Sequence, residues 1–155
     1  MRFLLALGLA LVSLCQVSAH SSDDDKAPAR YGVEPNLRLY PQGSAKQTLA
    51  SVIEAYENKR IPYLAAYLAS PTWVDQRVTE VHQGDFDKLV KEIATKYADD
   101  PKMLEDMKRF LKEGDWEGGE TTAAVKLKDI KDRQMFFRKI GKLWYLENKQ
   151  KPEDK

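Results

Sequence analysis

Residues 134–149, QMFFRKIGKLWYLENK, carry the strongest structural signal in this chain of 155 residues. Two runs rich in aromatic and aliphatic side chains flank the dipeptide Gly141-Lys142. Glycine at the first position of a two-residue turn is typical of a tight β-hairpin. The sequence therefore predicts an antiparallel hairpin in which Ile140 pairs with Leu143.

The alternation of side chains along this hairpin predicts two different faces. Pairing outward from the turn places on the core face Met135, Phe137, Trp144 and Leu146. The same pairing places on the outer face Phe136, Arg138, Tyr145 and Glu147. On the outer face, Arg138 and Glu147 are close enough to form an ion pair across the strands, which is typical of surface support.

Two further strands are expected between the helices and the hairpin. The helical spacing of apolar residues ends at Gly114, and Trp116 follows in a short candidate strand. The dipeptide Gly118-Gly119 predicts a turn, and residues 121–128 are rich enough in threonine, alanine and valine for another strand.

The part of the chain before Gly114 is predominantly helical in its spacing. Ser44 with Gln47 has the form of a capping box, and apolar residues at helical spacing follow as far as residues 58–60. A second short helix begins near Pro62, a third segment begins at Phe86, and Asp100-Pro101 is expected to cap and start another helix. Residues 72–78 fit either a short helix or an irregular turn. Helices first and strands last predict an α+β domain.

The N-terminus has the three parts of a secretory signal: Met1-Arg2, an apolar run over residues 3–14, and small residues ending at Ala19. The apolar run is too short to span a membrane. We expect cleavage near Ala19 and export to the periplasm or the extracellular space. The predicted organisation is a signal peptide at 1–19, a flexible tether at 20–40, a single domain at 41–149 and a charged tail at 150–155.

Charge and cysteine content exclude several classes of function. The chain has 25 basic and 24 acidic residues. Cleavage would remove Arg2 and the one cysteine, Cys15, and so leave a domain with balanced charge and no thiol. Such a domain lacks the basic excess of a nucleic-acid-binding protein. It also has no cysteine for a disulfide or a metal, and His20 and His82 are far apart in sequence, so we predict no metal site and no cofactor.

The closing hairpin combines an aromatic strand, a glycine turn and a Trp144-containing strand. With this hairpin at its end, the order of elements over about residues 44–149 resembles the nuclear transport factor 2-like superfamily, including its small exported bacterial members. The resemblance implies a bent sheet that wraps the helices into a cone. In enzymes such as ketosteroid isomerase the mouth of that cone binds a small molecule, whereas other members bind partners or dimerise. The helical insertion at residues 86–111 is expected to fill or cover the mouth. No acid or base of the enzymatic members aligns onto this chain, so no catalytic residue is predicted.

Two groups of residues form the candidate site. The first group is Asp75 and Arg77, which are close to Trp73 in the sequence. A carboxylate against an aromatic ring can have a raised pKa and act as a base. An ordinary ion pair between Asp75 and Arg77 at a helix end is the other interpretation of the same pattern. Aromatic residues at core-facing spacing either line a pocket or fill the core. The candidate pocket consists of Tyr56, Trp73, Asp75, Tyr97, Phe137 and Trp144.

These observations favour an exported, non-enzymatic binding or accessory module for a small apolar molecule or for another protein. The alternative is a small lyase or isomerase that uses Asp75 or Tyr97 in a cone-shaped pocket. A homodimer through the outer sheet face, which presents Phe136 and Tyr145, is compatible with both hypotheses.

Overall fold

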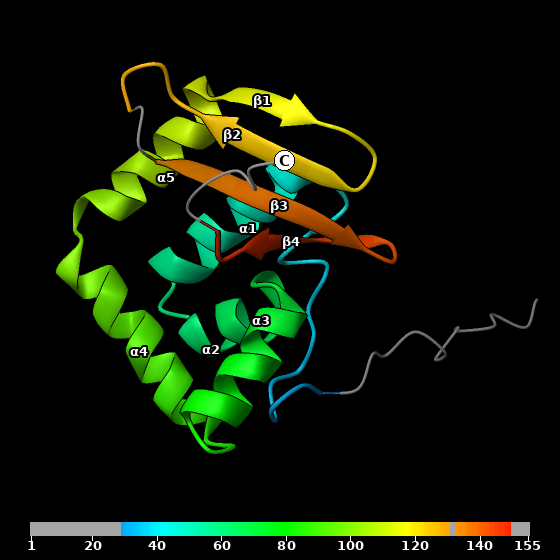
Figure 1. Ribbon diagram of the computed structural model, residues 1–155, viewed down its shortest axis with the longest axis vertical. Helices are drawn as coiled ribbons and strands as arrows, with labels where there is room; N and C mark the ends of the chain where they lie inside the picture. Colours follow the sequence, from blue (N-terminus) through cyan, green and yellow to red (C-terminus); the bar gives the residue numbers. More distant parts are fainter. Residues whose placement is uncertain (1–28, 131–132, 150–155) are drawn as a thin grey trace, which may run out of the picture.

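A computed structural model describes residues 29–130 and 133–149, and within them the chain is an α+β protein (Figure 1). Helices come first in the chain, and a four-stranded antiparallel sheet ending in a hairpin follows. The predicted fold class is therefore confirmed. The predicted signal peptide with its cleavage site, residues 20–28 of the tether and the tail at 150–155 lie outside the described residues.

Over the described residues, the helical part consists of five α-helices and two π-helical segments. The α-helices are α1 (Ala45–Glu57), α2 (Ile61–Tyr63), α3 (Pro71–Gln76), α4 (Phe86–Asp99) and α5 (Lys102–Glu113). The π-helical segments η2 (Leu64–Leu68) and η3 (Arg77–Val81) directly extend α2 and α3. The segment that the sequence left open between helix and turn is therefore helical.

Local side chains explain where the helices begin. The Ser44 hydroxyl accepts a hydrogen bond from the backbone N–H of Gln47 at 3.1 Å, and the Asp85 carboxylate accepts one from that of Lys88 at 3.1 Å. The expected cap at Asp100 is wrong, because no side chain caps α5. The Asp100 carboxylate instead faces the Arg133 guanidinium at 3.3 Å.

The sheet is a meander of the strands β1 (Asp115–Gly118), β2 (Thr122–Lys126), β3 (Gln134–Ile140) and β4 (Leu143–Glu147). Ile140 pairs with Leu143 across the turn, and Gly141 has a φ of +60°, a conformation that favours glycine. The predicted register of the hairpin is confirmed. The expected ion pair between Arg138 Nε and Glu147 Oε1 is present at 3.0 Å.

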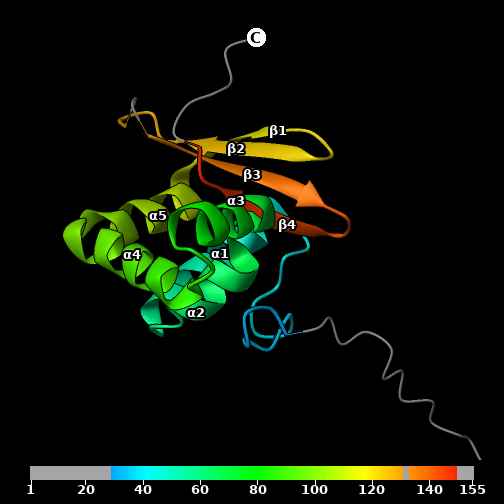
Figure 2. The same ribbon diagram turned by 60° about the horizontal axis from the view of Figure 1, so that its bottom comes forward.

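All the helices lie on one side of the sheet, so the fold has two layers (Figure 2). The core between the layers includes Leu49 and Phe110 from the helices and Val125, Phe137 and Trp144 from the strands. The outer face carries Phe136 and Tyr145, which are half-buried. The homodimer through this face stays a prediction.

Two segments pair with the outer edge of β4: the residues just before α1 and the residues just after η2. The backbone carbonyl of Gln42 accepts a hydrogen bond from the Trp144 N–H at 2.9 Å, and the backbone N–H of Ser70 donates to the Leu146 carbonyl at 2.8 Å. The carbonyl of Trp144 accepts from Gln42 Nε2 at 2.7 Å and from Thr48 Oγ1 at 3.1 Å. Backbone and side-chain groups of Gln42, Thr48 and Ser70 therefore satisfy an edge that would otherwise be buried with unpaired backbone groups.

Residues 29–40 have little regular structure and pack against the helices, along α3 and toward α1 (Figure 1). The Arg30 backbone N–H donates to the Tyr67 hydroxyl at 2.9 Å, and the Asn36 N–H donates to the Tyr63 hydroxyl at 3.0 Å. The Tyr40 side chain belongs to the core. The packed part of the chain therefore includes residues before Pro41.

We expect the substitution Gln42→Met to lower the free energy of unfolding by about 1–2 kcal/mol. Methionine has nearly the same side-chain volume as glutamine, but it lacks the amide that donates hydrogen bonds to the backbone carbonyls of Tyr67 and Trp144. The cost is moderated because the Trp144 carbonyl keeps its bond from Thr48. Urea denaturation measures the effect.

Gln76→Met is the matched control, because the exposed Gln76 amide contacts only the exposed Glu80. Its expected effect on the free energy of unfolding is below about 0.5 kcal/mol. Equal effects of the two substitutions would contradict the role assigned to Gln42.

Candidate functional site

The six predicted site residues occupy three separate environments. Trp73 and Tyr97 line a groove between the helices and the end of β4, and Tyr56 packs beside Tyr97. Phe137 and Trp144 are 1% and 8% exposed and line neither cavity of this groove. They belong to the core, which is the other interpretation that their spacing allowed. Asp75 lies outside the groove.

The groove consists of two adjoining cavities of about 160 and 190 Å³. We call it the Tyr97 groove. The residues that line both cavities are Tyr97, Met103, Leu146, Glu147 and Asn148. Trp73 and Ile93 line the first cavity, and Met107 and Met135 line the second. Helices α4 and α5, which were expected to cover the mouth of a cone, thus form one wall of the groove.

Tyr97 is the central polar side chain of the groove. The residue is 9% exposed, and its ring lies against that of Tyr56 with centroids 4.6 Å apart. Burial, together with the neighbouring Tyr56, raises the pKa of Tyr97 to about 12. The phenol is therefore protonated at neutral pH and can donate a hydrogen bond. No acceptor for that hydrogen is found within residues 29–130 and 133–149.

Asp75 and Arg77 do not pair with each other. The Asp75 carboxylate accepts hydrogen bonds of 2.5 Å from Arg30 and from the Tyr31 hydroxyl, and the Tyr31 ring stacks on Phe86 with centroids 4.3 Å apart. Asp75 therefore attaches the N-terminal segment to α3. Its side chain is 53% exposed, and Asp75 does not line the Tyr97 groove.

Arg77 instead belongs to a cluster around Glu92 on α4. The Glu92 carboxylate accepts hydrogen bonds from Arg77 at 2.9 and 3.1 Å and lies 2.8 Å from both His82 Nε2 and Lys96 Nζ. The π-helical segment η3 explains this convergence. Its bond from the His82 N–H to the Arg77 carbonyl stacks the two residues on one side of the turn.

The surroundings of Glu92 act on its ionisation in opposite directions. Burial by itself would raise the pKa of the carboxyl group, but the hydrogen bonds from Arg77, Lys96 and His82 outweigh burial and lower the pKa to about 2. No pattern in the sequence indicates this cluster, because Arg77 and Glu92 are brought together only by the turn between η3 and α4. The cluster holds η3 and α4 together beside the groove.

We expect Glu92 to make the protein sensitive to acid. Its pKa is 4.5 in a model peptide and about 2 in the folded chain, so the unfolded chain binds more protons in this range. The stabilisation is present above about pH 4.5 and is lost as the pH falls toward 2. The size of the loss is about 2–3 kcal/mol. Urea denaturation at pH 2 to 6 measures it.

The substitution Glu92→Gln should flatten this part of the pH profile, and Glu105→Gln is the control because Glu105 is an exposed glutamate on α5. A profile that falls as steeply in Glu92→Gln as in the original chain would contradict the assignment.

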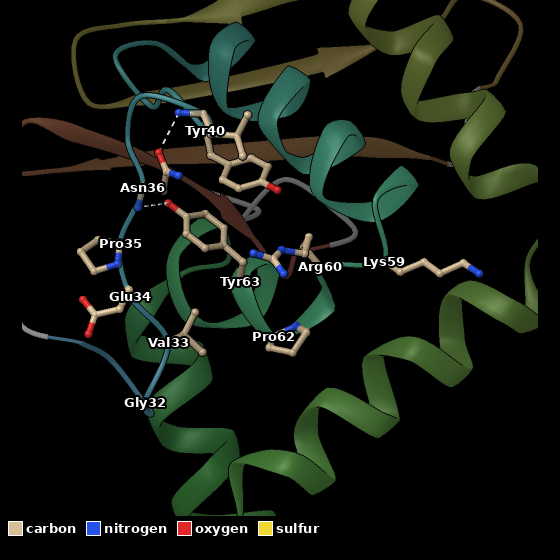
Figure 3. A pocket seen from close by; sticks show the side chains of 11 residues that line it. Gly32, Val33, Glu34, Pro35, Asn36, Tyr40, Lys59, Arg60, Pro62 and Tyr63 are labelled. Atoms are coloured by element: carbon tan, nitrogen blue, oxygen red, sulfur yellow. Dashed lines mark hydrogen bonds between the residues drawn. The ribbon is translucent and has the colours of Figure 1, made fainter.

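A larger cavity than either of these lies elsewhere, beneath the N-terminal segment (Figure 3). It has a volume of about 430 Å³ and lies between residues 32–40 and the stretch from Lys59 to Tyr63. Sequence reasoning missed its residues, because it treated residues 58–60 as a helix end and residues 20–40 as a tether. Only the folding of that segment onto α2 brings the two stretches together.

The remaining observations bear on other kinds of site. Among residues 29–130 and 133–149, no three histidine, cysteine, aspartate or glutamate side chains gather as a metal ion requires. In the same residues, no helix combines the length and the apolar character needed to cross a membrane. No protein-family model, curated protein or solved structure matches this chain.

Proposed function

We propose that the protein is an exported, non-enzymatic binding module that holds a small apolar molecule in the Tyr97 groove. One observation carries the proposal: a buried, protonated phenol without an acceptor among the described residues lies in a groove whose surface is mostly apolar, although Lys96, Glu147 and Asn148 also line it. Ligand sites commonly combine an apolar wall with a few polar groups that fix orientation.

The lining of the groove supports an apolar ligand of small size. Trp73, Ile93 and Leu146 supply aromatic and aliphatic surface, and Met103 supplies a flexible side chain that adapts to irregular shapes. Each cavity is smaller than the 300–1,000 Å³ or so that drug-sized ligands need. The ligand that fits best is therefore small, or extended enough to occupy both cavities.

The alternative, a small lyase or isomerase, has less support. Its two candidate groups were Asp75 and Tyr97, and these lie in different parts of the molecule. A phenol with a pKa of about 12 is a poor general base near neutral pH, because almost none of it is ionised. Binding without chemistry therefore agrees better with the geometry.

Two parts of this proposal rest on the sequence alone. Export rests on the signal-like residues 1–19, and the relation to the nuclear transport factor 2-like superfamily rests on the order of elements and the closing hairpin. The ligand proposal requires neither of them, since it depends only on the residues of the groove.

We expect the full chain to bind the neutral fluorophore N-phenyl-1-naphthylamine, which brightens in apolar sites, and the substitution Met103→Glu to weaken that binding by at least about tenfold. A carboxylate at Met103 would place charge in both cavities of the groove. Fluorescence titration measures the affinity.

The matched control is Leu111→Glu, which introduces the same charge at a half-buried position of α5 that lines neither cavity. Both substitutions should lower stability, and only Met103→Glu should lower the affinity. Absence of binding to the original chain, or equal weakening by the two substitutions, would overturn the proposal for this groove.

A further inference from the structure

We propose that the 430 Å³ cavity beneath the N-terminal segment is a second, separate binding site, specific for small organic molecules that carry a carboxylate. We call it the donor pocket, and it is lined by Gly32, Val33, Glu34, Pro35, Asn36, Leu39, Tyr40, Lys59, Arg60, Pro62 and Tyr63. Its volume lies within the range of about 300–1,000 Å³ that is typical of small-molecule sites.

Hydrogen bonds to the helices hold the outer wall of the pocket in place. A turn at residues 30–33 closes with two backbone bonds of 3.0 and 3.1 Å between Arg30 and Val33. The Tyr67 hydroxyl then donates to the Val33 carbonyl at 2.6 Å, and the Asn36 N–H donates to the Tyr63 hydroxyl. The wall is therefore fixed at both of its ends, and the cavity behind it is preformed.

The acceptors of Asn36 are already in use inside this wall. Its side-chain oxygen accepts from the Leu39 N–H at 3.0 Å (Figure 3). Its backbone carbonyl accepts from the Tyr40 N–H at 2.9 Å. The amide nitrogen of Asn36 is left as a donor. Within the described residues no acceptor for it is found.

Two tyrosines add further donors. The Tyr63 hydroxyl accepts the hydrogen bond from Asn36, so its own hydrogen remains available for a ligand. Tyr40 is only 2% exposed, and in the part of the chain that the structure describes its hydroxyl has no hydrogen-bond partner. The two rings pack with centroids 4.3 Å apart and form an aromatic wall. Burial raises the pKa of Tyr63, which keeps that phenol protonated.

Arg60 supplies the positive charge. Its guanidinium points toward Tyr63, whereas the Lys59 ammonium group points away from the other lining side chains (Figure 3). Glu34, the one acid in the lining, also directs its carboxylate away from them (Figure 3). Over residues 29–130 and 133–149, Arg60 has no ion-pair partner.

The pocket thus presents four donor side chains, from Asn36, Tyr40, Tyr63 and Arg60, and no inward-facing acidic side chain. This arrangement is complementary to an anion with several hydrogen-bond acceptors. A single planar guanidinium surrounded by neutral donors matches the charge and the flat shape of a carboxylate. A phosphate dianion would call for more positive charge than Arg60 alone provides. The rings of Tyr40 and Tyr63 with Leu39 and Pro62 offer apolar surface to the body of the ligand.

The test uses the full chain, labelled with ¹⁵N, and benzoate as the probe, followed by shifts of backbone amide signals. Benzoate should bind and should shift the amides of Asn36, Tyr40 and Tyr63. Arg60→Gln should weaken binding at least about tenfold, and Arg60→Lys should weaken it less, because it keeps the charge and loses the planar fork. Lys59→Gln is the matched control, since it removes a neighbouring charge that points away, and should change the affinity less than about twofold.

Other outcomes would overturn the proposal. Absence of benzoate binding at about 10 mM would refute a carboxylate site of useful affinity. Equal weakening by Arg60→Gln and Lys59→Gln would indicate diffuse attraction, and benzamide binding as tightly as benzoate would show that charge is not recognised. Tighter binding of inorganic phosphate would replace the carboxylate assignment. Arg60 is exposed, and thermal melting of each variant verifies that it is folded.

Discussion

The closure of the β4 edge is the constraint on which the arrangement of the two layers depends. The backbone groups of an edge strand that is covered by helices cannot form hydrogen bonds with water. Protein donors and acceptors must therefore pair with them. In this chain Gln42 and Ser70 pair with β4 as a further strand would, and Thr48 adds a side-chain donor from α1. The residues before α1 and the residues after η2 are consequently fixed to the same strand.

Both candidate sites follow from that attachment. The bond from Ser70 to Leu146 fixes the start of α3, and with it Trp73, beside the end of β4, where the Tyr97 groove opens. Gln42 fixes the chain at the other end of the N-terminal segment, so that Tyr40 and residues 32–36 lie over α2 and enclose the donor pocket. The two sites differ in chemistry because the Tyr97 groove is formed between helices and the end of β4, whereas the donor pocket lies behind a segment of irregular backbone.

The sequence predicted well the features that depend on neighbours along the chain. The hairpin register followed from alternation about Gly141, the start of α1 followed from the capping residue Ser44, and the start of α4 followed from the helical spacing that begins at Phe86. Interactions between distant residues were not predictable in this way. Asp75 binds Arg30, which is 45 positions away, and Asp100 faces Arg133 in place of the helix it was expected to cap. Periodicity also could not separate Phe137 in the core from Tyr97 in the groove, because both kinds of position require a buried aromatic side chain.

The polar groups at the two sites argue for recognition over chemistry, and the reason lies in how each group is paired. A catalytic carboxylate or phenol needs a partner that shifts its ionisation toward neutrality and a substrate site within reach. Glu92, which lies beside the groove, is held as an ion because hydrogen bonds from Arg77, Lys96 and His82 lower its pKa, and the Tyr97 phenol in the groove is held in its neutral form by burial. Groups whose charge is fixed in this way can orient a ligand through hydrogen bonds, and they are poorly suited to exchange protons with it. For this reason the proposed role is the binding of ligands whose acceptors these donors can satisfy.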